Sequence, residues 1–339
     1  MTKTVLITGI SGQDGGYLAE LLLKKGYVVY GIVRRSSSTS TEYLPKNDNL
    51  ILKYGDLNDI ESISSVIQQI KPDELYNLAS QSHVHVSFDL PISTMQTNGL
   101  STLNMLEAIR KYSPHTKFYN ASTSEIFGKG RTHPLDEKSP FHPKNPYGCA
   151  KVFAHCITVN YRESYNLFAC NGILFNHESP RRGVSFVTRK ITRAVAKHAL
   201  GEKKTLTLGN LDVRRDWGYA PEYVEAMWLM LQQDKPRDYV IATGETHSIR
   251  EFVEASFGEI GIKLDWKGRG VQEKGYDAKT KELLVAIDPS FYRPTEIDAL
   301  YGSTERAKKY LDWQPKIKYK DLVKIMVAAD VKELEEGKQ

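Results

Sequence analysis

The sequence feature that most constrains the fold is a glycine-rich turn near the amino end. Gly9, Gly12 and Gly15 follow an apolar run at residues 4–8 and precede a helical pattern at 17–25. Such glycines allow a tight turn in which backbone N–H groups approach a pyrophosphate, and the following helix directs its positive end at that anion. A plain strand-to-helix turn is the alternative, but this placement favours a dinucleotide site. Its candidate residues are Gly9, Ser11, Gly12, Gln13 and Asp14.

Short apolar runs alternate with helical patterns along the first half of the chain. We expect strands at 4–8, 27–33, 50–54, 74–79 and 117–122, and helices at 17–25, 60–70 and 94–111. Alternation of this kind is typical of a parallel sheet with helices on both faces. The sequence therefore predicts a Rossmann-type, doubly wound α/β fold.

The alternation weakens after residue 176 and returns with a helical pattern at 219–232 and a strand at 239–242. We therefore expect a cofactor-binding domain of residues 1–175, to which 217–245 return. Residues 176–216 and 246–330 then form a smaller C-terminal α/β domain that binds the substrate. Within it, the stretch 265–285 is rich in Lys and Gly and is expected to be an exposed loop or ribbon.

Composition excludes several classes of protein. Among 339 residues, 46 Lys and Arg stand against 41 Asp and Glu, and a net charge of +5 is too small to indicate a nucleic-acid partner. The three cysteines form no C-x-x-C pair, and the pair His83 and His85 has no accompanying Cys or carboxylate cluster, which disfavours a metal site. No stretch approaches the ~20 apolar residues of a membrane span, and the amino end has no signal-peptide pattern. We expect a cytoplasmic protein with no metal and no membrane partner.

The positive charge is concentrated in one segment. Residues 180–220 contain ten Lys or Arg and three acids, whereas the remainder of the chain is slightly acidic. A local excess of this kind indicates small phosphorylated ligands rather than a nucleic acid.

The end of the second predicted strand indicates which dinucleotide binds. An NAD enzyme places an acid there to hold the ribose 2′-hydroxyl, but this chain has Arg34, Arg35 and Ser36, and guanidinium groups suit a 2′-phosphate. NADP is therefore the predicted cofactor, although the same residues are also compatible with an exposed basic turn that binds no cofactor. Further candidates follow the third and fourth strands, where a structural role is equally compatible with the pattern. They are Asp56, Leu57, Leu78, Ala79, Gln81 and Ser82.

Candidate catalytic residues occur in two short motifs. Tyr147 and Lys151 are spaced i, i+4, which places them on one face of a helix, and the ammonium is expected to lower the pKa of the phenol so that it acts as a general base. Lys151 is also expected to hold the nicotinamide ribose. Thr123 and Glu125 follow the strand predicted at 117–122, where parallel sheets place their ligand crevice. A surface Tyr–Lys pair and a simple helix cap are the respective alternatives.

At these residues the chain resembles the extended short-chain dehydrogenase/reductase family. Within that family it is similar to the GDP-mannose 4,6-dehydratase group, over about residues 3–330. The stretches that carry the resemblance are 9–15, 31–38, 123–125, 176–183, 208–218 and 292–298. The resemblance implies a homo-oligomer, a dimer or a tetramer, in which the segment 178–183 and the Arg- and Ser-rich cofactor loop meet across subunits.

The resemblance also implies a reaction and its residues. Tyr147 takes the C4 hydroxyl proton of GDP-mannose while hydride passes to NADP, Thr123 hydrogen-bonds the C4 oxygen, and Glu125 moves the C5 proton to the departing C6 hydroxyl. Hydride then returns from NADPH to C6, so the cofactor ends as it began. His177 and Arg182 contact the cofactor. The residues implied to hold GDP-mannose are Ser82, Asn176, Lys190, Gly209, Asn210, Arg215, Arg293 and Glu296.

Two departures from the family pattern occur near the predicted cofactor pocket. An aromatic residue is expected at Ser93 and an acid near Asn98. A weaker hold on the cofactor would let the site reduce its keto product with NADPH toward a sugar such as GDP-rhamnose.

Other functions remain open to this sequence. One is another nucleotide-sugar epimerase or decarboxylase, although an epimerase does not need the carboxylate of Glu125. Another is a non-catalytic NADP-sensing regulator, although such proteins typically lack the Tyr or the Lys that are both present here.

Overall fold

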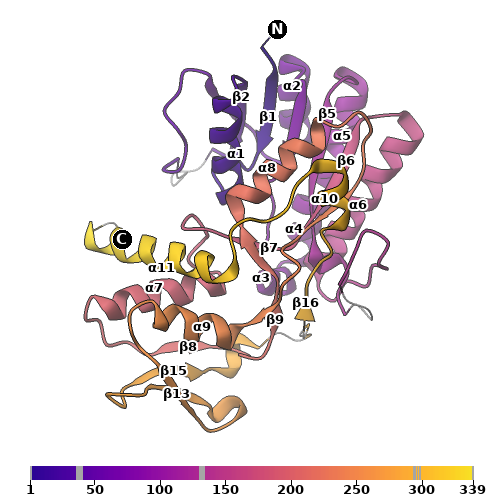
Figure 1. Cartoon of the computed structure of the whole chain (residues 1–339). Helices are drawn as coiled ribbons and strands as arrows, with labels where there is room; N and C mark the ends of the chain where they lie inside the picture. Colours follow the sequence, from indigo (N-terminus) through magenta and orange to yellow (C-terminus); the bar gives the residue numbers. More distant parts are fainter. Residues whose placement is uncertain are drawn as a thin grey trace.

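The core of the protein is a parallel sheet, seven-stranded among the residues that the structure describes (Figure 1). The structure is a computed structural model, and it describes residues 2–35, 41–129, 134–292, 295, 297 and 299–337. The strand order is β11-β6-β5-β4-β1-β2-β3. The strands are β1 (Thr4–Thr8), β2 (Val28–Val33), β3 (Leu50–Tyr54), β4 (Glu74–Asn77), β5 (Lys117–Thr123), β6 (Ala169–Leu174) and β11 (Tyr239–Ile241). The predicted doubly wound fold is confirmed.

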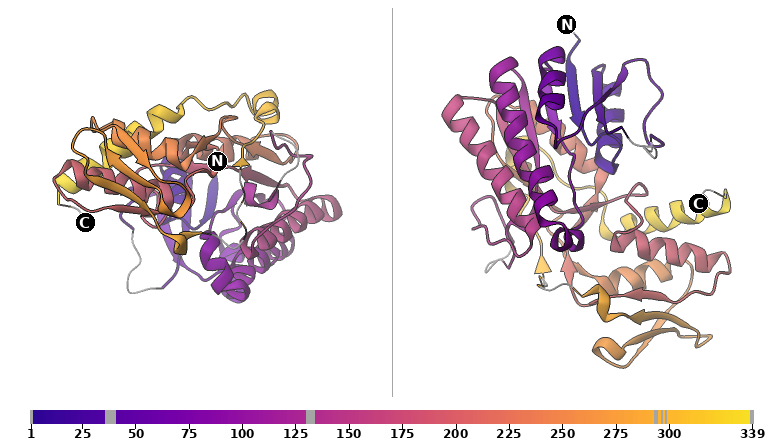
Figure 2. Two further views of the ribbon diagram at one scale, coloured as in Figure 1. Left: turned by 90° about the horizontal axis from the view of Figure 1, so that it is seen from below. Right: turned by 180° about the vertical axis from the view of Figure 1, so that it is seen from behind.

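Helices cover both faces of this sheet because its buried strands are apolar on both sides (Figure 2). Val5 and Ile7 of β1 pack toward one set of helices, and Leu6 packs toward the other. The first set is α1 (Gln13–Lys24), α8 (Ala220–Leu231) and α10 (Glu305–Leu311). The second set is α2 (Ile60–Ile70), α5 (Ser101–Tyr112) and α6 (Pro146–Tyr165).

The single helix predicted at 94–111 is divided in the structure. It consists of α4 (Pro91–Met95), a π-helical turn η1 (Gln96–Leu100) and α5. Within the π turn, the buried Asn98 accepts hydrogen bonds from the Ser80 hydroxyl and from the Gln81 N–H, each at 2.9 Å, and donates to the Gln81 carbonyl. The irregular turn therefore holds the loop that follows β4, in keeping with the frequent occurrence of π turns at functional sites.

A row of buried polar side chains crosses the sheet near the carboxyl ends of its strands. Thr8 donates to Asn77, Asn77 donates to Asn120, and Asn120 donates to Asn171, at 2.9, 3.2 and 2.8 Å. The Thr8 hydroxyl also accepts from the backbone N–H groups of Leu78 and Ala79. Because each buried polar group needs a partner, this row fixes the relative positions of four strands and of the loop after β4.

A smaller C-terminal lobe packs below the carboxyl ends of the strands (Figures 1 and 2). Its sheet is ordered β13-β14-β15-β8, with β8 (Leu206–Leu208), β13 (Leu264–Lys267), β14 (Lys274–Asp277) and β15 (Leu283–Ile287). Its helices are α7 (Val187–Ala199), α9 (Ile249–Gly258) and α11 (Tyr319–Glu335). The ribbon expected at 265–285 is present as antiparallel strands, but β15 is half-buried to buried and pairs in parallel with β8.

The chain passes several times between the sheet and the lobe. β7 (Asn176–Glu178) pairs with β10 (Trp217–Tyr219), and β9 (Arg214–Arg215) lies between β12 (His247–Ser248) and β16 (Ala299–Leu300). Within 217–245, α8 and β11 pack with the large sheet. The segment 246–330 is shared between both parts, because α10 and Trp313 belong to the core around α1 and α8. The remaining elements are α3 (Val84–Asp89), η2 (Ser124–Ile126), η3 (Gly270–Gln272) and η4 (Pro289–Phe291).

Candidate active site

A cavity of about 1450 Å³ lies where the carboxyl ends of the strands face the C-terminal lobe. It brings together nearly all of the predicted site residues. Those that line it are Gly9, Ser11, Gly12, Gln13, Asp14, Arg34, Asp56, Leu57, Leu78, Ala79, Gln81, Ser82, Thr123, Glu125, Tyr147, Lys151, Asn176, His177, Arg182, Lys190, Gly209, Asn210 and Arg215. Arg35 is exposed and is not part of this lining, whereas Ser36, Arg293 and Glu296 lie outside the described residues.

The glycine turn fits a dinucleotide pyrophosphate. Gly9 has a φ of +71°, and a Cβ there would lie 2.7 Å from the backbone nitrogen of Ala79. The close approach of the turn to the loop after β4 therefore requires glycine. At Gly12, the N-cap of α1, the nearest atom to a Cβ would be the Gly9 carbonyl oxygen at 3.3 Å. Gly12 therefore keeps the backbone open toward the cavity at the positive end of α1, where an anion is favoured.

His177 joins the start of α1 to β7. Its Nε2 lies 2.8 Å from Asp14 Oδ2, its Nδ1 lies 2.8 Å from the Phe175 carbonyl oxygen, and its ring stacks on Tyr223 at 4.7 Å. Burial disfavours the imidazolium, but the Asp14 carboxylate and the carbonyl outweigh it, so the pKa of His177 is raised. Burial also opposes ionisation of Asp14, yet the neighbouring His177 lowers its pKa. The resemblance implied a cofactor contact for His177, and the structure adds a fixed partner on the glycine turn.

Tyr147 and Lys151 lie in the first turns of α6, and both are buried. Burial raises the pKa of Tyr147 to about 12, the charge of Glu125 adds to the shift, and hydrogen bonds with Thr123 and Ser80 oppose it. Lys151 Nζ donates to the Ala121 carbonyl at 2.9 Å and lies 5.8 Å from the centre of the Tyr147 ring. Burial lowers the pKa of Lys151 to about 8. The expectation that the lysine lowers the pKa of the phenol is wrong for this structure, because desolvation dominates and the ammonium is directed at β5.

Thr123 and Glu125 reach the cavity from the end of β5. Thr123 is the N-cap of η2, and its hydroxyl accepts from the Glu125 N–H at 3.3 Å. Both side chains are buried, and Glu125 Oε2 accepts from Asn145 Nδ2 at 2.8 Å. A hydroxyl, a phenol and a carboxylate thus face one space. Such a set can abstract a proton, stabilise an oxyanion and return a proton to a leaving group.

The opposite end of the cavity lies in the C-terminal lobe and carries positive charge. Lys190 Nζ lies 3.7 Å from the centre of the Phe291 ring, and Phe291 is 47% exposed. Arg215 is buried and donates to the Ile297 carbonyl at 2.8 Å. The cations of Lys190 and Arg215 suit a diphosphate, and the flat, apolar ring of Phe291 lies beside Lys190.

The basic segment 180–220 is divided between two roles. Arg181, Arg182, Lys190 and Arg215 line the cavity. Others pair with acids from distant parts of the chain: Arg189 with Asp330 and Glu333, Arg193 with Glu333, and Arg214 with Glu251. The local excess of charge therefore overstated the charge offered to ligands, because acids of α9 and α11 neutralise part of it.

Among the described residues, the structure contains neither a cluster of metal ligands nor a membrane-spanning helix. His83 and His85 line the cavity, but no group of three or more His, Cys, Asp or Glu side chains in the described part of the chain could hold a metal ion. Within the same residues, none of the helices combines the length and the apolar character needed to span a bilayer.

Comparison with known proteins decides the family. The sequence pattern of the family described as GDP-mannose 4,6 dehydratase matches residues 6–326. The chain belongs to the GDP-mannose 4,6-dehydratase family. It is 54% identical to the GDP-mannose 4,6 dehydratase of Cricetulus griseus, covering 97% of this chain and 91% of that protein. Identity to the enzyme of the same name from Dictyostelium discoideum is 51%, over 99% of this chain and 98% of the relative.

Solved structures agree on the fold of this GDP-mannose 4,6-dehydratase family member. The dTDP-glucose 4,6-dehydratase of Bacillus anthracis, solved with NAD, has a TM-score of 0.81 at 21% identity, over 98% of both chains. RMD of Pseudomonas aeruginosa, solved with NADPH, has a TM-score of 0.77 at 22% identity, over 98% of this chain and all of that one. At these identities the likeness supports the Rossmann-type fold alone.

Several residues of this family member's site were missed by sequence reasoning. His83, Phe186 and Phe291 line the cavity, and only tertiary folding brings them there. Ser93 also lines it, where an aromatic residue was expected, and Asn98 has the buried structural role described above. Asn145 had a local signal, since Asn is a preferred N-cap and stands directly before Pro146 at the start of α6.

Proposed function

We propose that the protein is a GDP-mannose 4,6-dehydratase, a hydro-lyase that converts GDP-mannose to GDP-4-dehydro-6-deoxy-mannose and water. The observation that carries the proposal is the meeting of Thr123, Glu125 and Tyr147 in one cavity whose far wall carries Lys190 and Arg215. The first three supply proton transfers at a sugar, and the last two supply charge for a diphosphate.

We further propose NADP as the cofactor. The glycine turn and the start of α1 would hold its pyrophosphate, Arg34 at the end of β2 would meet a 2′-phosphate, and Lys151 would hold the nicotinamide ribose. Bound there, a nicotinamide supplies a reversible acceptor for one hydride. Cofactor choice is tested by the affinities for NADP and NAD, with a preference for NADP expected, and with Arg34→Glu expected to reverse that preference.

The side chains would then divide the proton transfers among them. The Tyr147 Oη takes the proton of the C4 hydroxyl, and the Thr123 hydroxyl donates a hydrogen bond to the C4 oxygen. The resulting ketone acidifies the C5 hydrogen. Glu125 removes that proton and delivers it to the C6 hydroxyl, which departs as water and leaves a double bond between C5 and C6. Addition of the returned hydride at C6, and return of the proton taken up by Tyr147 to C5, would complete the 4-dehydro-6-deoxy product with no net change in the cofactor. Because the pKa of Tyr147 is about 12, its phenol is protonated at pH 7 and has to be ionised for the first step.

Chromatography that separates epimers, followed by mass spectrometry of the separated products, tests the proposal. The protein is incubated with NADP and, separately, with GDP-mannose, a UDP-sugar and a dTDP-sugar. Loss of one water from GDP-mannose alone is expected. Loss of carbon dioxide, or a change of configuration at constant mass, would instead identify the decarboxylase or the epimerase alternative. No reaction with any sugar would favour the NADP-sensing regulator.

The fate of the product and a side reaction are inferred from the family resemblance and from the sequence. We propose that the product serves as a precursor of GDP-fucose or another GDP-6-deoxyhexose, and that excess NADPH permits slow reduction to GDP-rhamnose. Absence of NADPH consumption in a reaction with GDP-mannose would contradict the side reaction. Homo-oligomeric assembly and a cytoplasmic location stay predictions.

A further inference from the structure

We propose that Asn145 is a positioning residue that aims the Glu125 carboxylate and, with the same amide, fixes the helix that carries Tyr147. Asn145 Nδ2 donates to Glu125 Oε2 at 2.8 Å, and Asn145 Oδ1 accepts from the Gly148 N–H at 2.7 Å. The second bond caps α6. The inference rests on the proposed function, since it assigns Glu125 the proton transfers at C5 and C6.

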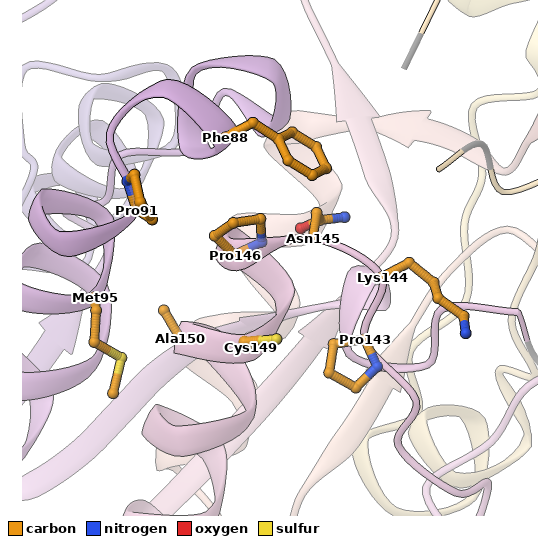
Figure 3. Close-up of a pocket in the computed structure, with 9 residues that line it drawn as sticks. All are labelled: Phe88, Pro91, Met95, Pro143, Lys144, Asn145, Pro146, Cys149 and Ala150. Atoms are coloured by element: carbon orange, nitrogen blue, oxygen red, sulfur yellow. The ribbon is translucent and has the colours of Figure 1, made fainter. Parts of the chain in front are cut away.

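Asn145 contacts Glu125 but is not among the residues that line the main cavity. It is 5% exposed and forms part of the wall of a shallow hollow of about 650 Å³, beside Phe88, Pro146 and Cys149 (Figure 3). Glu125 instead lines the main cavity and is 9% exposed. The amide thus contacts the carboxylate, although Asn145 is among the residues that line the hollow and not among those that line the main cavity.

The chemistry of the amide explains why this residue type suits the position. Asn, Asp and Ser are comparable N-caps, but their second functions differ. An amide has an acceptor for the helix N–H and a separate donor for the carboxylate. Asp would cap α6 while directing a second carboxylate oxygen at Glu125, and the shorter Ser hydroxyl would cap it without spanning to Glu125.

The close packing of the same turn restricts other arrangements. A Cβ at Gly148 would lie 2.9 Å from the Glu125 carbonyl oxygen, so the first turn of α6 lies directly against η2. A shift of Glu125 relative to α6 would therefore also move it relative to Tyr147. The two catalytic groups act in succession on one sugar ring, and such chemistry is sensitive to displacements near 1 Å.

Step-resolved kinetics of the holoenzyme with GDP-mannose test the inference. Asn145→Ser keeps a cap and loses the donor to Glu125, and we expect kcat to fall about 10-fold, the effect of one hydrogen bond, with KM within about 2-fold. Elimination is slowed more than C4 oxidation, so reduced cofactor should accumulate transiently in a single turnover. Asn145→Asp keeps the size of the side chain and should lower kcat about 100-fold, because like charges then face each other.

Asn166→Ala is the matched control at the other end of the same helix. Asn166 is the exposed C-cap of α6 with a φ of +53°, where Ala is strained, and α6 spans 20 residues between the two caps. This variant should lower Tm about as much as Asn145→Ser while leaving kcat and the transient unchanged. Equal losses of kcat in both variants would show that helix stability alone is responsible, and would overturn the inference.

The failures of the inference and of the proposed function are distinguishable. Wild-type kinetics in Asn145→Ser and Asn145→Asp, together with an inactive Glu125→Gln, would overturn the role of Asn145 and leave the function standing. Near-wild-type turnover in Glu125→Gln would overturn the proton-transfer role of Glu125 itself. If Asn145→Ser does not fold, the size-matched Asn145→Asp, with its capping oxygen retained, decides the question.

Discussion

His177 Nε2 lies 2.8 Å from Asp14 Oδ2, and this contact joins residues 163 positions apart in the sequence. Asp14 is in the first turn of α1, and His177 is in β7, where the chain leaves the large sheet for the C-terminal lobe. Gln13 Nε2 donates to the His177 carbonyl, and Gln13 Oε1 accepts from the Ser179 hydroxyl. The glycine turn and the segment that leads to the C-terminal lobe are therefore held as one unit.

This pair should make stability depend on pH. The raised pKa of His177 gives stability that is full below its unfolded value near 6.5 and is lost as pH rises through the folded value. The lowered pKa of Asp14 gives stability that is full above about 3.8 and is lost as pH falls through its folded value. Between these limits, His177→Asn should reduce the free energy of unfolding by about 1.5–3 kcal/mol, as for a hydrogen bond between charged groups.

Urea unfolding of wild type and His177→Asn across this pH range measures the effect. The difference between the two proteins should shrink above the folded pKa of His177. The exposed His115 provides the control, since His115→Asn should change stability little at any of these pH values. A difference that is constant with pH would contradict a charged His177.

Glu125→Gln should lose on the order of 10²–10⁴-fold in turnover of GDP-mannose, because the amide cannot take the C5 proton. Affinity for NADP, measured by calorimetry, should stay close to that of the wild type. Glu163→Gln, an exposed change on α6, should have wild-type turnover. Loss of NADP binding in Glu125→Gln would indicate a structural rather than a chemical role.

Gly12→Ala should weaken NADP binding with little change in stability. An added Cβ meets only the Gly9 carbonyl oxygen, at 3.3 Å, and the φ of −80° at Gly12 suits any residue. We expect an affinity for NADP at least about 10-fold lower, as for 1.4 kcal/mol of lost contact with the pyrophosphate. Gly9→Ala should instead impair folding, since its Cβ would overlap the backbone of Ala79. Unchanged affinity in a folded Gly12→Ala would place the pyrophosphate elsewhere.

Asn120→Leu should lower the free energy of unfolding by about 2–5 kcal/mol, because it removes the partner of both Asn77 and Asn171 at buried positions. Chemical denaturation measures this loss. Gln68→Leu on the exposed side of α2 is the control and should change stability by less than about 0.5 kcal/mol. A similar small change at Asn120 would show that the polar row contributes little.

Much of the site could be predicted because its motifs are local. The glycine turn lies between a strand and a helix, and the i, i+4 spacing of Tyr147 and Lys151 places them on one helix face. Thr123 ends β5, and Glu125 lies in η2, which follows it directly. Backbone geometry alone brings the carboxyl ends of parallel strands to one edge. The lining residues at the strand ends followed from this rule, whereas the lining residues between 176 and 215 were implied by the family resemblance.

The remaining features depend on contacts between distant segments. Burial, rather than the adjacent ammonium, sets the pKa of Tyr147, and acids of α9 and α11 neutralise arginines that looked available to ligands. Desolvation and ion pairing depend on what surrounds a group in three dimensions, so no spacing rule predicts them.

The sequence by itself determined the family, the doubly wound fold and the identity of the groups that meet at the strand ends, because periodicity and short motifs specify backbone geometry. Only the tertiary structure decided how those groups are held. His177 is tied to Asp14, and Asn145 bonds both Glu125 and the start of α6. The reason is physical: the charge and the aim of a buried side chain depend on its partners, and these come from segments that the linear order keeps apart.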